Sequence, residues 1–315
     1  MAWSRGFGLA DVENLVPVTT RTVFRFASIS KPITAVAVLQ LVEQDKLDLD
    51  APIQRYVPSF PEKAWPITPR QLLGHLGGVR HYRGDEMHST WHYFGVRHAL
   101  TVFRNDPLIH EPGTKFLYST YGYNLAGAAV QEVALQRFSD HVRAQIFKPS
   151  GMIHTRIDDN RLIIPHRASG YIRIQGGRLR NSAPCDVSNR GPGAGFCGTA
   201  EDLARFAIAI ESGALLKPET VALMFQSQTT TDGKPTGYGL GWSIDSDNNK
   251  GSNPVEVSHL GQMPRVSNVL LLRPKERSAV VLLSNLEGQG ARLLALAHKI
   301  AEAVSQEVQR TAKAP

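Results

Sequence analysis

The chain has 315 residues, of which 42% are hydrophobic and 20% charged, the balance of an ordinary globular protein. It contains no apolar run of about 18 residues, so a membrane-spanning helix is not expected. The net charge of +7 comes from scattered basic residues rather than a basic block, which argues against nucleic-acid binding.

Neither the first residues nor the cysteines reveal the compartment. Residues 1–6 show no apolar core of a secretion signal, so the localisation stays open between the cytoplasm and export with a leader outside this sequence. The two cysteines, Cys185 and Cys197, form no metal-ligand pattern. One bridge between them stays geometrically open, but two free thiols are expected.

The first predicted helix begins next to Ser28. Residues 1–25 predict a strand or hairpin that leads to it. Pro32 has no N–H, so the Ser28 carbonyl cannot accept the usual helical hydrogen bond, and Ser28 must lie at or before the start of the helix. Its side chain is then close to backbone N–H groups that have no intrahelical partner. The helix is expected to end near Gln44.

Helices dominate the middle of the chain, and two strands and a helix follow at its end. Residues 51–115 predict short helices joined by long loops. The later predicted elements are, in chain order, a helix at 120–135, a helix opened by the N-cap Thr199, a short helix at 218–225, an antiparallel hairpin of strands 269–272 and 279–283, and an amphipathic helix at 290–306.

These elements predict a mixed α/β (α+β) fold. Because strands are expected at both ends, the simplest arrangement is an antiparallel sheet built from both chain termini and flanked by helices, with a mainly helical region inserted. We expect residues 1–50 and 255–315 to form the sheet domain and residues 51–254 to form the inserted region. The active site is expected in the cleft between them.

The chemistry starts from the pair Ser28 and Lys31. Positions i and i+3 lie on one face of a helix, so the lysine amine can reach the serine oxygen. A serine hydroxyl is a weak nucleophile until a neighbouring base takes its proton, and a neutral lysine is such a base. Ser-x-x-Lys alone is weak evidence, because the spacing occurs by chance in many chains.

Two further motifs strengthen the prediction that Ser28 and Lys31 form a catalytic pair. Tyr118 directly precedes the 120–135 helix and can relay protons if a nearby cation lowers its pKa, although most tyrosines simply pack their ring. Ser258-His259-Leu260-Gly261 stands where an edge strand is expected, just before the terminal hairpin. Gly261 would let a substrate backbone approach closely, and the alternative is a structural glycine beside a strand histidine.

The order of these three motifs resembles the serine β-lactamase and penicillin-binding protein superfamily. The tyrosine triplet and His-x-Gly are similar to the branch of class C β-lactamases, family VIII esterases and S12 serine peptidases. The sequence around these motifs resembles the mitochondrial serine β-lactamase-like group and its bacterial relatives over nearly the whole chain. The segments that carry this likeness are 26–31, 46–50, 56–58, 75–76, 80–82, 105–108 and 116–120.

This resemblance implies a role for each matching residue. Ser28 Oγ would attack a carbonyl and form an acyl-enzyme, and Lys31, held neutral by desolvation and nearby charge, would share the proton with Tyr118. Which of the two is the base stays open. The backbone N–H groups of Ser28 and Gln262 would form the oxyanion hole.

His259, Gly261 and Thr120 are expected to face the substrate. His259 takes the place usually held by lysine in the lactamases. Its charge is expected to depend on pH near neutrality, and it would bond Tyr118 or a substrate carboxylate. Thr120 stands where the lactamases carry asparagine, which favours esters or peptide-like amides over β-lactams. Family members also have a strand before residues 6–8, so either the sequence is truncated or the sheet has a gap.

The sequence therefore predicts a serine hydrolase of small ester or peptide substrates, with no cofactor. A β-lactamase or D,D-peptidase is one alternative, and a penicillin-binding-like sensor or self-assembling scaffold with little turnover is another. Self-association of the chain stays open. Several histidines invite a metal hypothesis, but their spacings fit no ligand pattern, and no metal is expected: His75, His81, His88, His92, His98 and His110.

Overall fold

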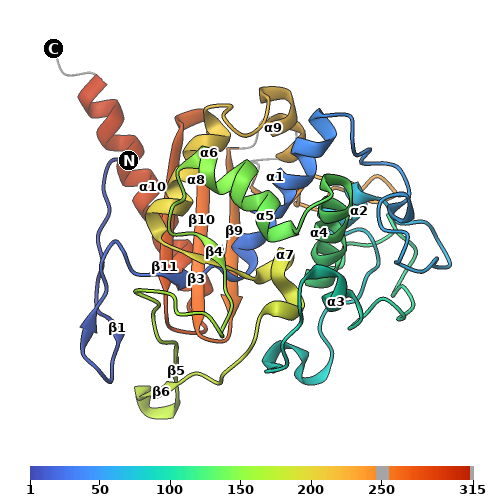
Figure 1. Ribbon diagram of the computed structural model, residues 1–315. Coiled ribbons are helices and arrows are strands. Elements are labelled where there is room, and N and C mark those ends of the chain that lie inside the picture. Colours follow the sequence, from blue (N-terminus) through green and yellow to red (C-terminus); the bar gives the residue numbers. More distant parts are fainter. Residues whose placement is uncertain (246–254, 313–315) are drawn as a thin grey trace.

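The computed structural model describes residues 1–245 and 255–312, with side chains as far as residue 306 (Figure 1). Its largest sheet is antiparallel, with the strand order β11-β10-β9-β8. The strands are β8 (Ser243–Asp245), β9 (Glu256–Met263), β10 (Val266–Arg273) and β11 (Ser278–Ser284). The predicted terminal hairpin is thus confirmed as β10 and β11, which pair from Ser267↔Ser284 to Arg273↔Ser278.

Helices cover both faces of this sheet. On one face, Val269 and Leu271 of β10 pack with Ala297 and Ala301 of the terminal helix α10 (Gly290–Ala312). The alternate residues of β10 join the main core on the other face, to which α8 (Ala200–Glu211) contributes. Successive side chains of a strand point to opposite faces, so a strand covered on both sides is apolar throughout, as β10 is over most of its length.

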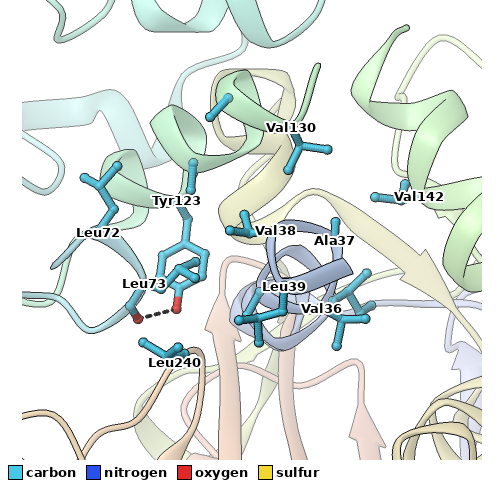
Figure 2. Packing of buried hydrophobic residues seen from close by; sticks show 14 of the residues in the cluster. Val36, Ala37, Val38, Leu39, Leu72, Leu73, Tyr123, Val130, Val142 and Leu240 are labelled. Carbon is cyan, nitrogen blue, oxygen red and sulfur yellow. Dashed lines mark hydrogen bonds between the residues drawn. The ribbon is translucent and has the colours of Figure 1, made fainter. Parts of the chain in front are cut away.

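The helical part is built around α1 (Ser30–Glu43). From Ser30 to Leu39 every residue of α1 is buried, as expected for a helix that is apolar on all sides. Helix α4 (Thr120–Ala134) packs against it, and Figure 2 shows Tyr123 of α4 between α1 and Leu73, whose carbonyl accepts the tyrosine hydroxyl at 2.6 Å. The short helix α7 (Gly191–Ala194) also packs against both.

The other elements are short. The remaining α-helices are α2 (Pro69–Leu73), α3 (Val96–Leu100), α5 (Phe138–Val142), α6 (Lys148–Ser150) and α9 (Pro218–Met224). The remaining strands form the ribbon β1 (Leu9–Asp11) with β2 (Val16–Pro17), the ribbon β5 (Tyr171–Arg173) with β6 (Leu179–Asn181), and a small sheet of β3 (Phe24–Arg25), β7 (Phe196–Gly198) and β4 (Arg156–Ile157). Single helical turns occur at η1 (Ala27–Ile29), η2 (Ile53–Arg55), η3 (Gly84–His88), η4 (Arg143–Phe147), η5 (Gln175–Gly177), η6 (Ser188–Arg190) and η7 (Pro274–Glu276).

The mixed α/β class with antiparallel sheets and flanking helices is confirmed, but one detail differs. Among the described residues, the N-terminal strands do not pair with the four-stranded sheet: β1 pairs with β2, and β3 with β7. Just past β11, the side-chain amide of Asn285 donates to the carbonyls of Leu9, Ala10 and Ser169 at 2.9–3.3 Å. The N-terminal segment is therefore attached to the sheet through a side chain rather than a strand ladder.

The division into two domains stays a prediction. Helix α8 lies within the range 51–254 yet packs against β11, so the helical region and the sheet are not separated along the sequence as simply as expected. The boundary at residues 254 and 255 adjoins 246–254, which lie outside the described residues. Within the described ranges, no helix is both long and apolar enough to cross a membrane.

Candidate active site

Ser28 lies in η1, immediately before α1, as Pro32 required. The residues on either side of it, Ala27 and Ile29, are fully buried, whereas Ser28 is partly exposed. Ala27 adopts φ +51°, in the left-handed region that non-glycine residues rarely enter. This turn aims the Ser28 side chain away from the core while its backbone stays within it.

The Lys31 amine has three hydrogen-bond partners. Its Nζ is 3.1 Å from Ser28 Oγ, 3.1 Å from Thr120 Oγ1 and 2.9 Å from the carbonyl oxygen of Gly193 in α7. Gly193 has to be glycine, because a Cβ there would lie 2.5 Å from Thr120 Cγ2. The close contact between α7 and α4 therefore brings the Gly193 carbonyl to the amine.

The surroundings of Lys31 favour its neutral form. It is fully buried and pairs with no carboxylate among the residues that the structure describes. Its pKa is well below the ordinary lysine value, first because of burial and then because of the nearby charge of Arg190. A neutral amine has two N–H donors and one lone pair. Donation to Gly193 and Thr120 leaves the lone pair free to accept the Ser28 hydroxyl proton.

Tyr118 faces the same serine. Ser28 lies close enough to act on the pKa of the Tyr118 phenol, and the ring lies 4.6 Å from Lys31 Nζ. Burial raises the pKa of the phenol above its ordinary value. A phenol pKa lowered by a nearby cation, the condition set from the sequence, is therefore not met. At neutral pH Tyr118 is a protonated phenol, which can donate a proton.

Two histidines that the sequence analysis did not connect with the site hold the start of α4. His75 Nδ1 accepts the backbone N–H of Ser119 at 3.1 Å, and His81 Nδ1 accepts that of Thr120 at 3.2 Å. The His75 ring lies 4.3 Å from that of Tyr118. Burial lowers both pKa values, that of His81 to about 4, so both rings stay neutral acceptors. Some 40 residues separate them from Tyr118, and no local spacing signals the contact.

His259 reaches the site but differs from the expectation. It is 4% exposed, its Nε2 lies 2.9 Å from the hydroxyl of Tyr238, and its Nδ1 lies 2.7 Å from the carbonyl of Leu260. A carbonyl only accepts, so Nδ1 carries the hydrogen and Nε2 accepts from Tyr238. Burial lowers its pKa to about 3.

The expected pH-dependent charge near neutrality is therefore wrong for His259. Protein groups occupy both ring nitrogens, and the rings of His259 and Tyr118 are 6.4 Å apart at their centroids, with Tyr238 rather than Tyr118 as the bonded phenol. His259 thus provides a neutral ring at the position where the lactamases carry a lysine.

The backbone of β9 offers an open edge to the site. β8 pairs with residues 256–258 only, so within the described residues the second half of β9 has a strand neighbour on one side alone. Met263 and Val266 face each other across a two-residue turn, so the backbones of these two residues hydrogen-bond each other. In an antiparallel ladder only every second residue of β9 bonds to β10 in this way, and Gln262 is one of the residues that do not. The N–H of Gln262 therefore points away from β10, toward the open edge, as an oxyanion donor requires.

Two expected substrate contacts are corrected. A Cβ at Gly261 would lie 2.3 Å from the carbonyl oxygen of Phe26, so this glycine accommodates the protein's own backbone beside η1 rather than a substrate. Thr120 is 1% exposed and its hydroxyl faces Lys31, so it holds the amine in place instead of reaching a substrate.

Among the described residues, these side chains adjoin no cluster of metal ligands. Over residues 1–245 and 255–312, no group of three or more histidine, cysteine, aspartate or glutamate side chains is placed to hold a metal ion. A cavity of about 550 Å³ lies under the loop around residues 83–93 and is lined by Glu86, Trp91 and Asn189 among others, but not by Ser28, Lys31 or Tyr118. Both cysteines are free and buried, as expected.

The site combines a serine at the start of a helix with a lysine within hydrogen-bond distance of its oxygen. A tyrosine and the open edge of a strand lie beside them. This combination defines a serine hydrolase that works by acyl transfer. Comparison with known proteins agrees with that class. The chain belongs to the beta-lactamase family, whose model matches residues 1–305.

Relatives and solved structures extend this likeness. The chain is 31% identical to the mitochondrial serine beta-lactamase-like protein LACTB of Homo sapiens, over 87% of this chain and 66% of that protein, so it spans just under two thirds of that relative's length. A penicillin-binding protein from Bacillus halodurans is 25% identical, with a TM-score of 0.79 over 93% of this chain and 90% of that one. An octameric penicillin-binding protein homologue from Pyrococcus abyssi, 23% identical with a TM-score of 0.74 over 90% and 66% of the two chains, shares the fold.

Proposed function

We propose that the protein is a serine hydrolase that cleaves small esters or peptide-like amides through an acyl-enzyme on Ser28. The observation that carries the proposal is the hydrogen-bond set of Lys31. Its Nζ lies 2.9 Å from the Gly193 carbonyl oxygen and 3.1 Å from both Thr120 Oγ1 and Ser28 Oγ. A neutral amine that donates to Gly193 and Thr120 keeps its lone pair for the Ser28 hydroxyl. This arrangement favours Lys31 over Tyr118 as the base that activates the serine.

The reaction then runs in two balanced halves. The Ser28 proton passes to Lys31 Nζ as the bond between Oγ and the carbonyl carbon forms. Collapse of the tetrahedral intermediate breaks the bond to the leaving alkoxide or amine, which takes a proton through the Tyr118 hydroxyl. Water next attacks the ester carbonyl and gives its proton to the same pair, and Ser28 Oγ leaves and regains a proton.

The oxyanion would be stabilised by the backbone N–H groups of Ser28 and Gln262. Ser28 stands at the N-terminal end of α1, and the Gln262 N–H points toward the open edge of β9. One donor of this kind lowers the barrier by about 3 kcal/mol, because it is fixed where negative charge develops.

The neutral state of His259 supports uncharged substrates. Penicillins and cephalosporins carry a carboxylate, which needs a cation or free donors beside the reacting carbonyl. His259 has a pKa of about 3 and both its nitrogens are engaged, so it supplies neither. Thr120 is turned to Lys31 and offers no amide to a β-lactam side chain. Both features favour esters and neutral amides.

The test compares p-nitrophenyl esters of several acyl lengths with a chromogenic cephalosporin. We expect ester turnover to exceed cephalosporin turnover, and Ser28→Ala to abolish it. Ser212→Ala is the matched control, because Ser212 is an exposed serine at the end of α8. Mass spectrometry after a fluorophosphonate should place the adduct on Ser28.

Two results would overturn the proposal. Cephalosporin turnover far above ester turnover would favour a β-lactamase or D,D-peptidase. An acyl adduct that a p-nitrophenyl ester leaves on Ser28 and that never hydrolyses would favour a sensor or scaffold.

A further inference from the structure

A second buried polar cluster lies around Arg25 of β3, the strand that precedes η1. It surrounds a cavity of about 10 Å³, lined among others by Arg25, Asp158, Arg167, Cys197 and Arg265. A volume of this size holds about one water-sized body. The lining comes from β3, the segment after β4, and the turn between β9 and β10.

Positive charge exceeds negative charge around this cavity. Asp158 is 2% exposed and pairs with Arg25 Nε at 2.5 Å and with a terminal nitrogen of Arg167 at 2.8 Å. The guanidinium of Arg265 forms no ion pair among the described residues, and the carboxylate of Glu287 accepts the backbone N–H of Arg265 at 2.9 Å. Burial raises the pKa of Cys197 to about 12, so this thiol adds no negative charge. Three guanidinium groups thus share one carboxylate.

Two hydrogen-bond donors of the cluster lack an acceptor. The Nε atoms of Arg167 and Arg265 are buried, and neither has a hydrogen-bond partner among the described residues. Arginine keeps its proton even when buried, so these N–H groups cannot be neutralised by deprotonation. Both side chains are partly exposed, that of Arg167 by 24%, but their Nε donors are buried. A buried donor without an acceptor is costly, and an acceptor that carries negative charge removes that cost.

We propose that this cavity binds one small inorganic monoanion of the size of chloride, between the guanidinium groups of Arg167 and Arg265. The volume excludes phosphate, sulfate and carboxylic acids larger than formate, and the excess positive charge excludes a cation. A water molecule would satisfy the two donors but not the charge. The other N–H groups of Arg25 are already bonded to Asn160 and Cys185, so Arg25 contributes mainly its charge.

The anion would stabilise the strand that leads into the candidate active site. Arg25 belongs to β3, and its carbonyl accepts the side-chain amide of Asn268 at 2.7 Å, which ties β3 to β10. The proposal does not depend on the activity of Ser28, so the two can fail separately.

The experiment measures thermal unfolding of the full chain, prepared in sodium gluconate, as chloride replaces gluconate at constant ionic strength. We expect the Tm to rise by about 2 °C or more and to saturate. In Arg265→Gln the chloride effect should disappear, whereas Arg143→Gln, at an exposed arginine paired with Asp140, should keep it.

Two results would overturn the proposal. An equal Tm in chloride and gluconate, or a chloride effect that persists in Arg265→Gln, would mean that the cavity holds water only. Crystals grown in sodium bromide provide a check that does not depend on folding of the variant. An anomalous peak between Arg167 and Arg265 is expected, and its absence would contradict the site.

Discussion

Two buried basic side chains flank Ser28, and they differ in their partners and in the direction of their pKa shifts. Arg25, three residues before it, is 6% exposed and forms an ion pair with Asp158 at 2.5 Å. Lys31, three residues after it, is fully buried and bonds only to hydroxyl and carbonyl oxygens. Asp158 helps to raise the pKa of Arg25, whereas the pKa of Lys31 is well below its ordinary value.

The difference lies in the partner and in the side chain. A buried guanidinium stays charged and needs a carboxylate, whereas a buried amine without a carboxylate releases its proton. Arg25 therefore forms a structural ion pair, whereas Lys31 can act as a base. Four substitutions test this contrast, from the largest expected effect to the smallest.

Replacement of Lys31 should affect activity far more than folding. In Lys31→Met the base is lost, and we expect kcat/KM for a p-nitrophenyl ester to fall by about 10²–10⁴-fold. The Tm should stay close to that of the parent, because methionine fills the space and no ion pair is broken. Lys31→Arg should be just as inactive and also less stable, since arginine brings a permanent charge to a site without a carboxylate. An active Lys31→Arg protein would contradict the assignment of a neutral base.

Replacement of Arg25 should instead affect stability. Arg25→Met leaves Asp158 with one partner fewer in the core, and we expect the free energy of unfolding to fall by about 3–5 kcal/mol. Urea unfolding measures this loss. The exposed pair of Arg143 and Asp140 gives the control, because Arg143→Met should change stability by less than about 1 kcal/mol. Equal losses in the two variants would remove the contrast between the buried pair and an exposed one.

Thr120 tests the hydrogen-bond set of the amine. Thr120→Val keeps the shape of the side chain but removes one acceptor from Lys31 Nζ. We expect kcat to fall by about 10-fold, from the loss of one hydrogen bond, with little change in KM because the residue is 1% exposed. Thr120→Ser should retain most of the rate. A large rise in KM with unchanged kcat would show instead that the hydroxyl contacts the substrate.

The smallest expected effect is the pH dependence due to His81. Its pKa falls to about 4 in the folded protein, so between pH 6.5 and 4 the unfolded chain binds more protons. The free energy of unfolding should therefore decrease as the pH falls through this window. His81→Gln can keep an acceptor for the Thr120 N–H and should flatten the slope. An unchanged slope in urea unfolding at pH 4.5 and 6.5 would place the titrating groups elsewhere.

Local rules predicted the elements near the site well. Pro32 placed Ser28 ahead of α1, Thr199 accepts the Asp202 N–H as an N-cap, and the terminal hairpin forms as expected. These features depend on residues close in sequence. The sheet membership of the N-terminal strands was not predicted, because the Asn285 side chain, far away in sequence, fixes that segment.

Protonation states could not be predicted in the same way. The neutral form of His259 depends on burial, and the low pKa of Lys31 depends on burial and on the charge of Arg190, which lies far away in the sequence. Sequence motifs name the groups that meet in a site, but they do not show which atoms are desolvated or which hydrogen bonds are already made.

The most direct test of the neutral lysine is its own titration. NMR of protein labelled at lysine Cε follows the chemical shift of each lysine with pH, and Lys31→Met assigns the signal of Lys31. A Lys31 signal that is already that of a neutral amine at pH 7, while the other lysines stay charged, is the predicted result. A titration midpoint near the ordinary lysine value of about 10.4 would contradict the assignment of Lys31 as the base.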